Sequence, residues 1–436
     1  MIAPRSHARL RAAAASSTAA ALLLAALSSA QEARADGLPP YPIDVAGVKL
    51  SVFGYIQADA VLLDQSSEDE LNPATQQPLN TERINIKRAH IRLDAARENL
   101  GAAVEVEGST TNGPTLSLFA AELLAHWGET REGLPLPPVL LSLGLTRIPF
   151  GYEVRQHDLE RPFLEQSTVV RALFPGSTQL GLRARGAWRF LRYDVGVMSG
   201  EPRGSAQFAA EAPTHALDLL GRGGVDVELW PGVRFEAGVS GLEGTGFHPG
   251  TPATKDQLVW RDANGDGIVQ LSEIQIIPGT AAEPSATFRH FAMGADAHLS
   301  AQLPFGAVVV GGEVIWAMDL DRALYVADPV ASGRDQRESG YSASAVWSGL
   351  PFGGALGVRY DRYNPDADAT DAEGGALVPV DASLSTLALM ASVRYQTLLR
   401  LMIEYDRNHN AMGRSANGSP ASLAADAFTV RVEVAY

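Results

Sequence analysis

Apolar side chains recur at every second position from residue 47 to the end of the chain, and this alternation limits the fold more than any other feature. The last segment, 428–436, reads Phe-Thr-Val-Arg-Val-Glu-Val-Ala-Tyr. Because successive side chains of a β-strand point to opposite faces, apolar groups collect on one face and charged groups on the other. Segments with the same sorting lie at 191–197, 225–229, 233–239, 356–360, 387–395 and 401–405. The pattern predicts an all-β protein.

The lengths of the connections separate two all-β architectures. About sixteen strands are expected, and the joints between them alternate between short and long. The short joints fall near 96–100, 188–190, 230–232, 303–306, 349–353 and 396–398. The long joints fall near 61–82, 149–177, 199–216, 242–285, 319–337, 363–382 and 408–422. Two joints depart from this pattern: 129–136 is somewhat longer than the other short joints, and 109–114 is short where a long one is expected. A soluble sandwich would also alternate along its strands, but only a barrel sorts its loops by parity. We therefore expect residues 47–436 to form a transmembrane antiparallel β-barrel of about sixteen strands, with short periplasmic turns and long extracellular loops.

The first 35 residues have the order of a secretory signal peptide. Basic residues precede an Ala/Leu-rich run from Ala12 to Leu27, and Ala33-Arg34-Ala35 ends the segment. A membrane anchor is the alternative, but the apolar run is shorter than the ~20 residues that span a bilayer. Residues 36–46 would then form a short N-terminal lead. Export to the outer membrane, with lipid around the barrel, is the expected location.

Composition excludes several classes of protein. The chain has no cysteine, so disulfides and thiolate metal sites are excluded. Its formal net charge is −15, and removal of residues 1–35 takes away four arginines and one glutamate, which makes it −18. A nucleic-acid partner is not expected, because binding phosphate backbones requires a basic surface.

Three stretches between residues 86 and 198 resemble the phosphate-selective porin family of the O/P type. They are the basic alternating segment 86–94, the segment 143–151 ending in Pro-Phe-Gly, and the segment from 159 through Phe174-Pro-Gly176 to 182. The resemblance implies a sixteen-stranded porin, a homotrimer, whose loop 149–177 narrows the lumen. Phosphate selection in that family uses lysine clusters as well as arginines. Here only Lys49, Lys87 and Lys255 are present, so anions such as phosphate are one solute class among several.

The expected pore-lining residues come from this loop and from the polar faces of strands. The loop contributes Arg155, Arg161 and Arg171 beside several carboxylates. Strand parity adds Arg88, Arg92, Arg183, Arg185 and Arg192, with Glu105 and Glu107 facing them. Opposite charges across a constriction create a transverse field that favours small hydrated solutes. The alternative is that these charges pair with one another and hold the loop in place.

Residues 262–273 fill the twelve-residue EF-hand calcium pattern. The expected ligands are Asp262, Asn264, Asp266, the Ile268 carbonyl, Gln270 through a water, and Glu273, with Gly267 at the sharp turn. The flanks are not long amphipathic helices, so a paired calcium sensor is not expected. We predict a structural Ca²⁺ that orders the long insertion 242–285 outside the cell; a plain Asp/Gly-rich turn is the alternative.

No catalytic constellation is apparent. The histidines are scattered, and no serine lies in a Gly-x-Ser-x-Gly elbow. The chain is therefore expected not to be an enzyme, but a porin through which small hydrophilic solutes or ions diffuse. The rival hypothesis is a surface structural or adhesion protein that uses the barrel as an anchor and carries a calcium-stabilised loop.

Overall fold

The computed structural model describes residues 43–65, 80–128, 136–200, 216–373, 375–396, 398–414, 421 and 423–436. The predicted signal peptide, 1–35, and residues 36–42 of the predicted lead lie outside the described residues. Among the described residues, no helix combines the length and the apolar run needed to cross a bilayer.

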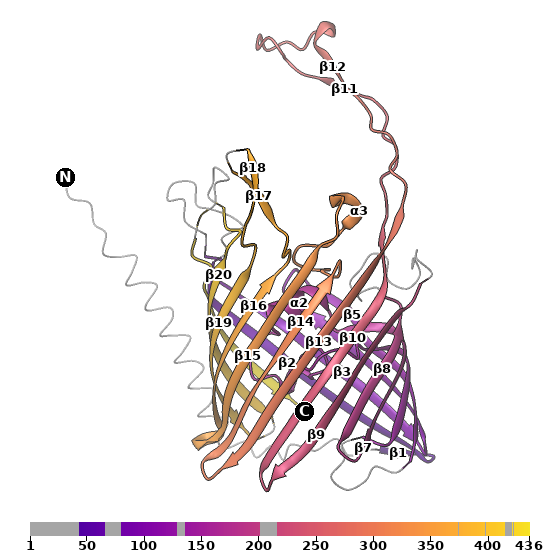
Figure 1. Ribbon diagram of the computed structural model, residues 1–436, viewed down its shortest axis with the longest axis vertical. Helices are drawn as coiled ribbons and strands as arrows, with labels where there is room; N and C mark the ends of the chain where they lie inside the picture. Colours follow the sequence, from indigo (N-terminus) through magenta and orange to yellow (C-terminus); the bar gives the residue numbers. More distant parts are fainter. Residues whose placement is uncertain are drawn as a thin grey trace, which may run out of the picture. The chain divides into compact units, whose positions relative to one another are not determined.

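Sixteen antiparallel strands of the described chain form a closed barrel, which confirms the predicted fold class (Figure 1). Each strand pairs with its neighbours in chain order, and β2 closes the barrel by pairing with both β3 and β21. The wall strands are β2 (Val48–Asp64), β3 (Arg83–Arg97), β4 (Leu100–Ser109), β5 (Thr115–Trp127), β6 (Val139–Arg147), β7 (Thr178–Trp188), β8 (Leu191–Met198), β9 (Asp218–Trp230), β10 (Val233–His248), β13 (Ala286–Leu303), β14 (Gly306–Met318), β15 (Arg337–Leu350), β16 (Gly354–Asn364), β19 (Leu384–Tyr395), β20 (Leu399–Asn410) and β21 (Ala427–Ala435). The short β1 (Ile43–Val45) extends the sheet as a hairpin with β2.

The connections alternate in length as predicted, including the short exception between β4 and β5 at 110–114. The turn from β13 to β14 spans 304–305, whereas the next connection, from β14 to β15, spans 319–336. The smaller elements lie in the connections: η1 (Asp158–Glu160), α2 (Thr168–Leu173), β11 (Gln257–Trp260), η2 (Leu271–Glu273), β12 (Ile274–Ile277), α3 (Pro329–Ser332), η3 (Pro351–Gly353), β17 (Thr370–Glu373) and β18 (Ala376–Pro379). The long connections therefore meet at one rim and the short turns at the other.

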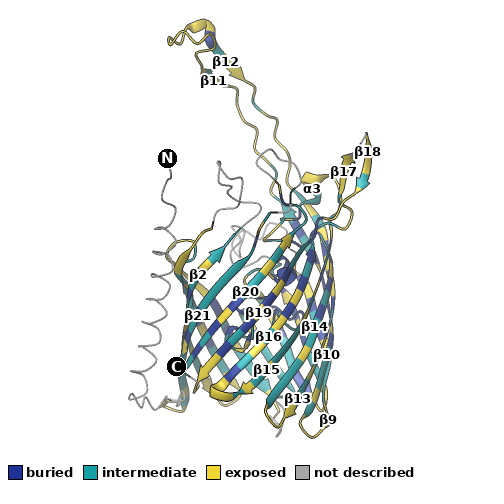
Figure 2. Cartoon of the chain, turned by 90° about the vertical axis from the view of Figure 1, so that its left-hand side faces the viewer, coloured by how far each residue is buried: buried dark blue, intermediate teal, exposed yellow. Residues whose placement is uncertain are grey.

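Burial alternates along the wall strands because one face looks inward and the other outward (Figure 2). On β20, Met402 and Glu404 are each 2% exposed, whereas Ile403 between them is 41% exposed. An exposed belt of aliphatic side chains around a closed sheet suits contact with lipid rather than water. The sixteen strands thus place polar side chains inside and aliphatic ones outside over most of the wall.

Two sequence expectations need correction. The insertion predicted at 242–285 is shorter, because β10 continues to His248 and β13 begins at Ala286. The ladder between these strands extends through Gly246, and Leu242 is buried within it. The inner face is also not charged all the way round. On β14, Ile315 and Ala317 are buried on the inner face, in a strand whose one charged residue is Glu313.

Candidate functional site

The connection from β6 to β7, residues 148–177, folds into the lumen and contains η1 and α2. Its backbone and side chains bind β2, β3, β10, β14, β16, β20 and β21. These strands lie on widely separated parts of the wall. The loop is thus fixed across the lumen rather than attached at its ends alone, as the expected constriction requires.

The start of the loop docks against a carboxylate of β14. Glu313 accepts hydrogen bonds from the backbone N–H groups of Tyr152 and Glu153, each at 3.1 Å. The preceding N–H, of Gly151, donates to Ser240 Oγ at 3.0 Å. Gly151 has φ +59°, and a Cβ there would lie 2.0 Å from Glu313 Oε1. Glycine is required at this position both by its backbone conformation and by the close approach of Glu313.

The middle of the loop is anchored by Glu165. Its carboxylate receives hydrogen bonds from Arg88 at 2.7 Å and from Arg431 at 3.0 Å, and Lys87 Nζ lies 3.6 Å away. Burial alone would raise the pKa of Glu165, but Arg88, Lys87 and Arg431 together hold this pKa well below its usual range. The Glu165 carboxylate is therefore charged at neutral pH and joins β3 and β21 through the loop.

A second carboxylate, Asp158 in η1, belongs to the same network, since Arg88 lies close to both carboxylates. Asp158 accepts a hydrogen bond from Tyr55 Oη at 2.8 Å and forms an ion pair with Arg161 at 2.7 Å. Burial would raise the pKa of Asp158, yet Arg161, Arg88 and Arg147 lower it. The loop thus carries two ionised carboxylates in a buried setting, each surrounded by arginine.

Wall arginines also bind the loop through its backbone carbonyls. Arg431 donates to Leu164 O at 2.8 Å, Arg359 to Glu165 O at 2.7 Å, and Arg400 to Arg161 O at 2.9 Å. These contacts join three wall strands to the segment 161–165. They satisfy buried backbone groups that would otherwise lack partners in this irregular segment.

The outer half of the lumen beside this loop holds an apolar cluster. Val169, Val170 and Leu173 of α2 are each at most 2% exposed and belong to one buried group with Phe150 and Phe174. The wall contributes residues near the long-loop ends of its strands, namely Met198, Leu220, Leu242, Ala292, Ile315, Ala317 and Tyr363. The inward loop therefore packs as a small hydrophobic core against β8–β10 and β13–β16.

On the side of the short turns, the loop borders a cavity of about 810 Å³. The wall side of this cavity consists of inner faces of β13–β16, β19 and β20, and it extends to the turn residues Gly353 and Gln396. The loop side is the segment 152–165. A pocket of this size is within the range of small-molecule sites.

The predicted pore-lining residues fall into two groups. Those on strands face the lumen and pair with carboxylates: Arg92 with Asp94 and Glu105, Arg183 with Asp194, and Arg192 with Asp226. Glu105 also contacts His90 Nδ1 at 2.6 Å, while Glu107 lies 3.7 Å from His90 Nε2. Arg185 is partly buried, and its Nε has no hydrogen-bond partner among the described residues.

The loop arginines are arranged differently from one another. Arg161 is buried in the Asp158 network described above, and Arg155 lies 3.7 Å from Asp194 and 3.8 Å from Glu236. Arg171 is exposed at the end of α2 and donates to Thr168 Oγ1. Two of the three loop arginines, Arg155 and Arg161, thus lie beside carboxylates.

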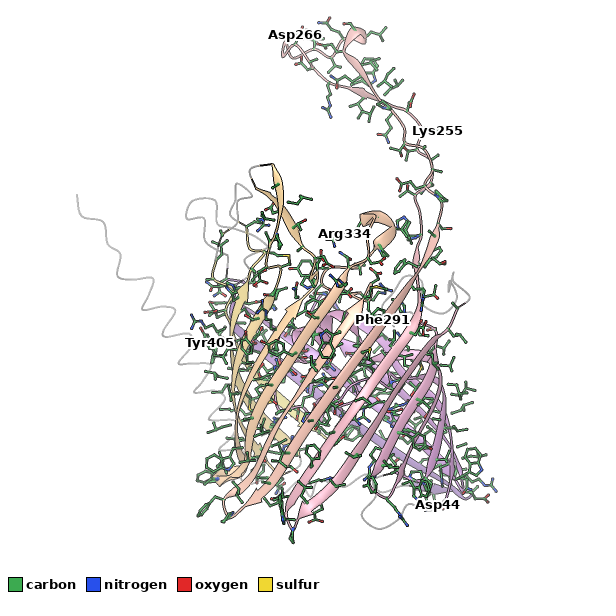
Figure 3. The ribbon with its side chains drawn as sticks, viewed as in Figure 1. Asp44, Lys255, Asp266, Phe291, Arg334 and Tyr405 are labelled. Carbon is green, nitrogen blue, oxygen red and sulfur yellow. The ribbon has the colours of Figure 1, made fainter. Side chains whose placement is uncertain are left out.

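The calcium-like segment lies in the excursion between β10 and β13, where Figure 3 labels Asp266. The strands β11 and β12 pair on either side of it, and Glu273 is 8% exposed. Asp262 accepts from the N–H groups of Gly265 and Gly267 at 2.7 Å, and Glu273 accepts from Gln270 N at 2.9 Å. Within the described part of the chain, no three Asp, Glu or His side chains gather in a metal-binding arrangement. The carboxylates instead bind backbone N–H groups.

The sequence did not identify several of the residues that hold the loop. Arg359, Arg400 and Arg431 alternate with apolar neighbours, so strand parity could place their side chains inside the barrel. Their partners in the loop could not be predicted from the neighbouring sequence. Lys87 points inward because a bulge shifts the register between Gln57 and Ala58. The role of Glu313 in holding the loop could not be predicted, since this residue follows two glycines in a mostly apolar strand.

Comparisons with known proteins are consistent with this geometry at the level of the fold. No protein-family model matches the chain, and no curated protein matches it in sequence. A solved structure of OprB from Pseudomonas putida has a TM-score of 0.56 at 10% identity, covering 89% of this chain and 94% of that one. The outer membrane channel DcaP of Acinetobacter baumannii has a TM-score of 0.54 at 10% identity, covering 91% of this chain and 100% of that one. The fold is that of outer-membrane porins.

Proposed function

We propose that this chain is an outer-membrane channel through which small hydrophilic solutes and ions diffuse passively. The observation that carries the proposal is the inward loop 148–177, held across a closed barrel by charged and backbone contacts. A loop that narrows a polar lumen gives a filter for size and charge. The exposed aliphatic belt supports a place in the lipid of the outer membrane, and the segment 1–35 supports export.

The selectivity that we propose is for small polar solutes, anions among them. Arginines line the inner faces of β3 and β7, but carboxylates neutralise most of them. Preference for phosphate in particular would rest on the resemblance of residues 86–198, and lysine is scarce in this chain. A homotrimer is part of the same proposal, and cross-linking of the protein in detergent would test it.

Recording the purified full-length chain in a planar bilayer tests the channel. We expect stable current steps in sodium chloride, with a reversal potential in asymmetric salt that reports the ion preference. Replacing Arg185, whose Nε lacks a partner within the described chain, with glutamine should shift that potential towards cation preference. The Arg337→Gln variant, which changes an exposed pair with Asp368, should leave it unchanged. Absence of steps in every preparation would overturn the proposal.

One observation favours a second function. The apolar cluster around α2 fills part of the outer lumen, which suits a barrel that anchors surface loops rather than conducting. A surface structural or adhesion protein of this kind would stay silent in the bilayer while its loops bound a partner. The recording described above therefore separates the two functions directly.

We further propose that residues 262–273 bind a structural Ca²⁺. The support is the pattern of oxygen-bearing side chains and the positive φ of Gly265 and Gly267, at +73° and +81°, which let the segment turn tightly. Trp260 lies two residues before Asp262, so terbium luminescence excited through this indole would report binding. Terbium emission that calcium displaces is expected, and the Asp262→Ala variant should lose it. Equal emission from the variant would exclude this site.

A further inference from the structure

Apolar side chains lie on both sides of the cavity between the inward loop and the wall, among arginines, glutamates and serines. The wall contributes Val309 of β14, Val346 of β15 and Met390 of β19, interspersed with serines. The loop contributes Leu159, Pro162 and Phe163. A lumen that passes only hydrated ions has no need of such surfaces, because apolar groups replace none of the hydrogen bonds of a hydrated ion.

Arginine side chains in the same cavity retain unused hydrogen-bond donors. Arg161 and Arg359 are 6% and 5% exposed, and the Nε of each finds no hydrogen-bond acceptor in the described chain. The Nε of Arg359 lies 3.3 Å from Asp361 Oδ2 without hydrogen-bond geometry. Buried donors without acceptors are rare in folded proteins, because burial removes the water that would otherwise bind them.

A third arginine, Arg394 of β19, is the most accessible of the set. Its side chain is 44% exposed, and its contacts are long, 3.4 Å to Leu159 O and 3.8 Å to Glu433 Oε1. Arg400 is less available, because it already donates to the carbonyls of Arg161 and Pro162. Arg394 can therefore turn towards a ligand with little loss of existing contacts.

The carboxylates that line the cavity are mostly engaged. Glu313 binds the loop N–H groups described above, and Glu153 accepts from Ser167 N at 3.0 and 3.1 Å. Glu165 is held by Arg88 and Arg431. Glu160 is exposed. Three of the four carboxylates of the cavity are therefore engaged by other groups, and Arg394 is an accessible cation that can bind an anion.

We propose that this cavity binds an organic anion in which a carboxylate is attached to a compact apolar body, such as an aromatic carboxylate of the size of benzoate. The guanidinium of Arg394 receives the carboxylate, in a cavity that the buried side chains of Arg161 and Arg359 also line. Val309 and Val346 contact the apolar body, while Phe163 packs behind them against Met390. This inference rests on the proposed function in one respect, because the ligand must enter the cavity through the lumen of the channel. It adds to that function the chemical class of a solute that the channel binds. Inorganic phosphate and acetate lack the apolar body and gain nothing from this wall.

Two measurements on the full-length chain in detergent or in bilayers test the site. Isothermal titration is expected to show that benzoate binds at least tenfold more tightly than acetate or phosphate. Benzoate is also expected to reduce the single-channel current carried by sodium chloride, whereas acetate at the same concentration does not. Arg394→Gln and Val346→Ser should each weaken benzoate binding at least tenfold. Arg337→Gln, on an exposed pair outside the cavity, is the matched control and should bind as the unmodified chain does.

The outcomes distinguish the two proposals. Current steps together with benzoate binding no tighter than acetate would overturn the organic-anion site and leave the channel intact. Benzoate binding without current steps would support the site and overturn the channel. Loss of benzoate binding in Val346→Ser supports the site when this variant keeps the heat-dependent gel mobility of a folded barrel. If Val346→Ser does not fold, Val309→Ser takes its place. Binding unaltered in both folded valine variants would overturn the apolar half of the proposal.

Discussion

Asp59 and Arg431 face each other across β2 and β21, the strand pair that closes the barrel, and are joined by two hydrogen bonds of 2.7 and 2.8 Å. Both residues are at most 5% exposed. The same guanidinium binds Leu164 O and Glu165 of the inward loop. One arginine therefore connects the seam of the cylinder to its constriction.

Replacing Arg431 with glutamine should destabilise both features. Removal of one partner leaves Asp59 buried without its counterion, which typically costs about 3–5 kcal/mol. We expect a lower midpoint of urea unfolding for the barrel refolded in liposomes. Arg337→Gln disrupts the exposed pair with Asp368, and that midpoint should not move. Similar midpoints for the two variants would mean that the seam pair contributes little.

The docking of Gly151 predicts a difference between two glycine variants. Gly151 and Gly333 both have positive φ, at +59° and +72°. Alanine at either position therefore costs about 1–2 kcal/mol of backbone strain. Only at Gly151 does the new Cβ also collide with a side chain, Glu313, whose two oxygens are held by the loop. Gly151→Ala should change the single-channel conductance, whereas Gly333→Ala should not. An unaltered conductance in Gly151→Ala would show that the entry of the loop does not set the constriction.

Acidification should release the Glu165 and Asp158 contacts of the loop only at low pH. The pKa values of Glu165 and Asp158 are lower in the folded chain than in the unfolded chain, as described above. Their contribution to stability is therefore complete above the unfolded values of about 4, and it is lost as the pH falls through the depressed folded values. The part of the conductance change that depends on Glu165 and Asp158 should appear only below about pH 4. Glu165→Gln should reduce this acid effect, and an equal acid effect in the variant and the unmodified chain would contradict the prediction.

Calcium removal should expose one surface segment to protease. Trypsin has few cleavage sites in the excursion 249–285, which contains only Lys255 and Arg261 as basic residues. Arg261 directly precedes Asp262, so a bound ion should slow trypsin there. We expect cleavage at Arg261 to accelerate when calcium is chelated, with the barrel fragments still associated. Equal cleavage rates with and without calcium would contradict the proposal, and Asp262→Ala should cleave rapidly in both conditions.

The barrel could be predicted from the sequence because its wall follows two local rules. Apolar side chains recur with a period of two along each strand, and short and long connections alternate along the chain. The sequence was insufficient where residues distant in sequence meet. Arg431 and Leu164 are in contact although 267 positions separate them, and no local pattern encodes that contact. The β14 segment Val308-Val-Val310 is apolar on both faces, so periodicity alone could not show that Val309 looks into the cavity.

The loop residues were predictable in kind but not in arrangement. The clustering of charges at 153–165 indicated a constriction, and the loop does cross the lumen. Which arginine would pair with which carboxylate depended on wall strands. A single bulge at Lys87 decides whether one cation points inward, and such a shift leaves no mark on the alternation of β3.

Because segment 161–165 is tied to β16, β20 and β21 at the same time, it acts as a cross-strut inside the cylinder. A sideways force on the barrel wall would change the distances between these three strands. The loop segment that they hold would move with them. The width of the constriction is therefore coupled to the cross-sectional shape of the barrel. A lateral force on the outer surface can thus change the width of the solute path without any hinge motion.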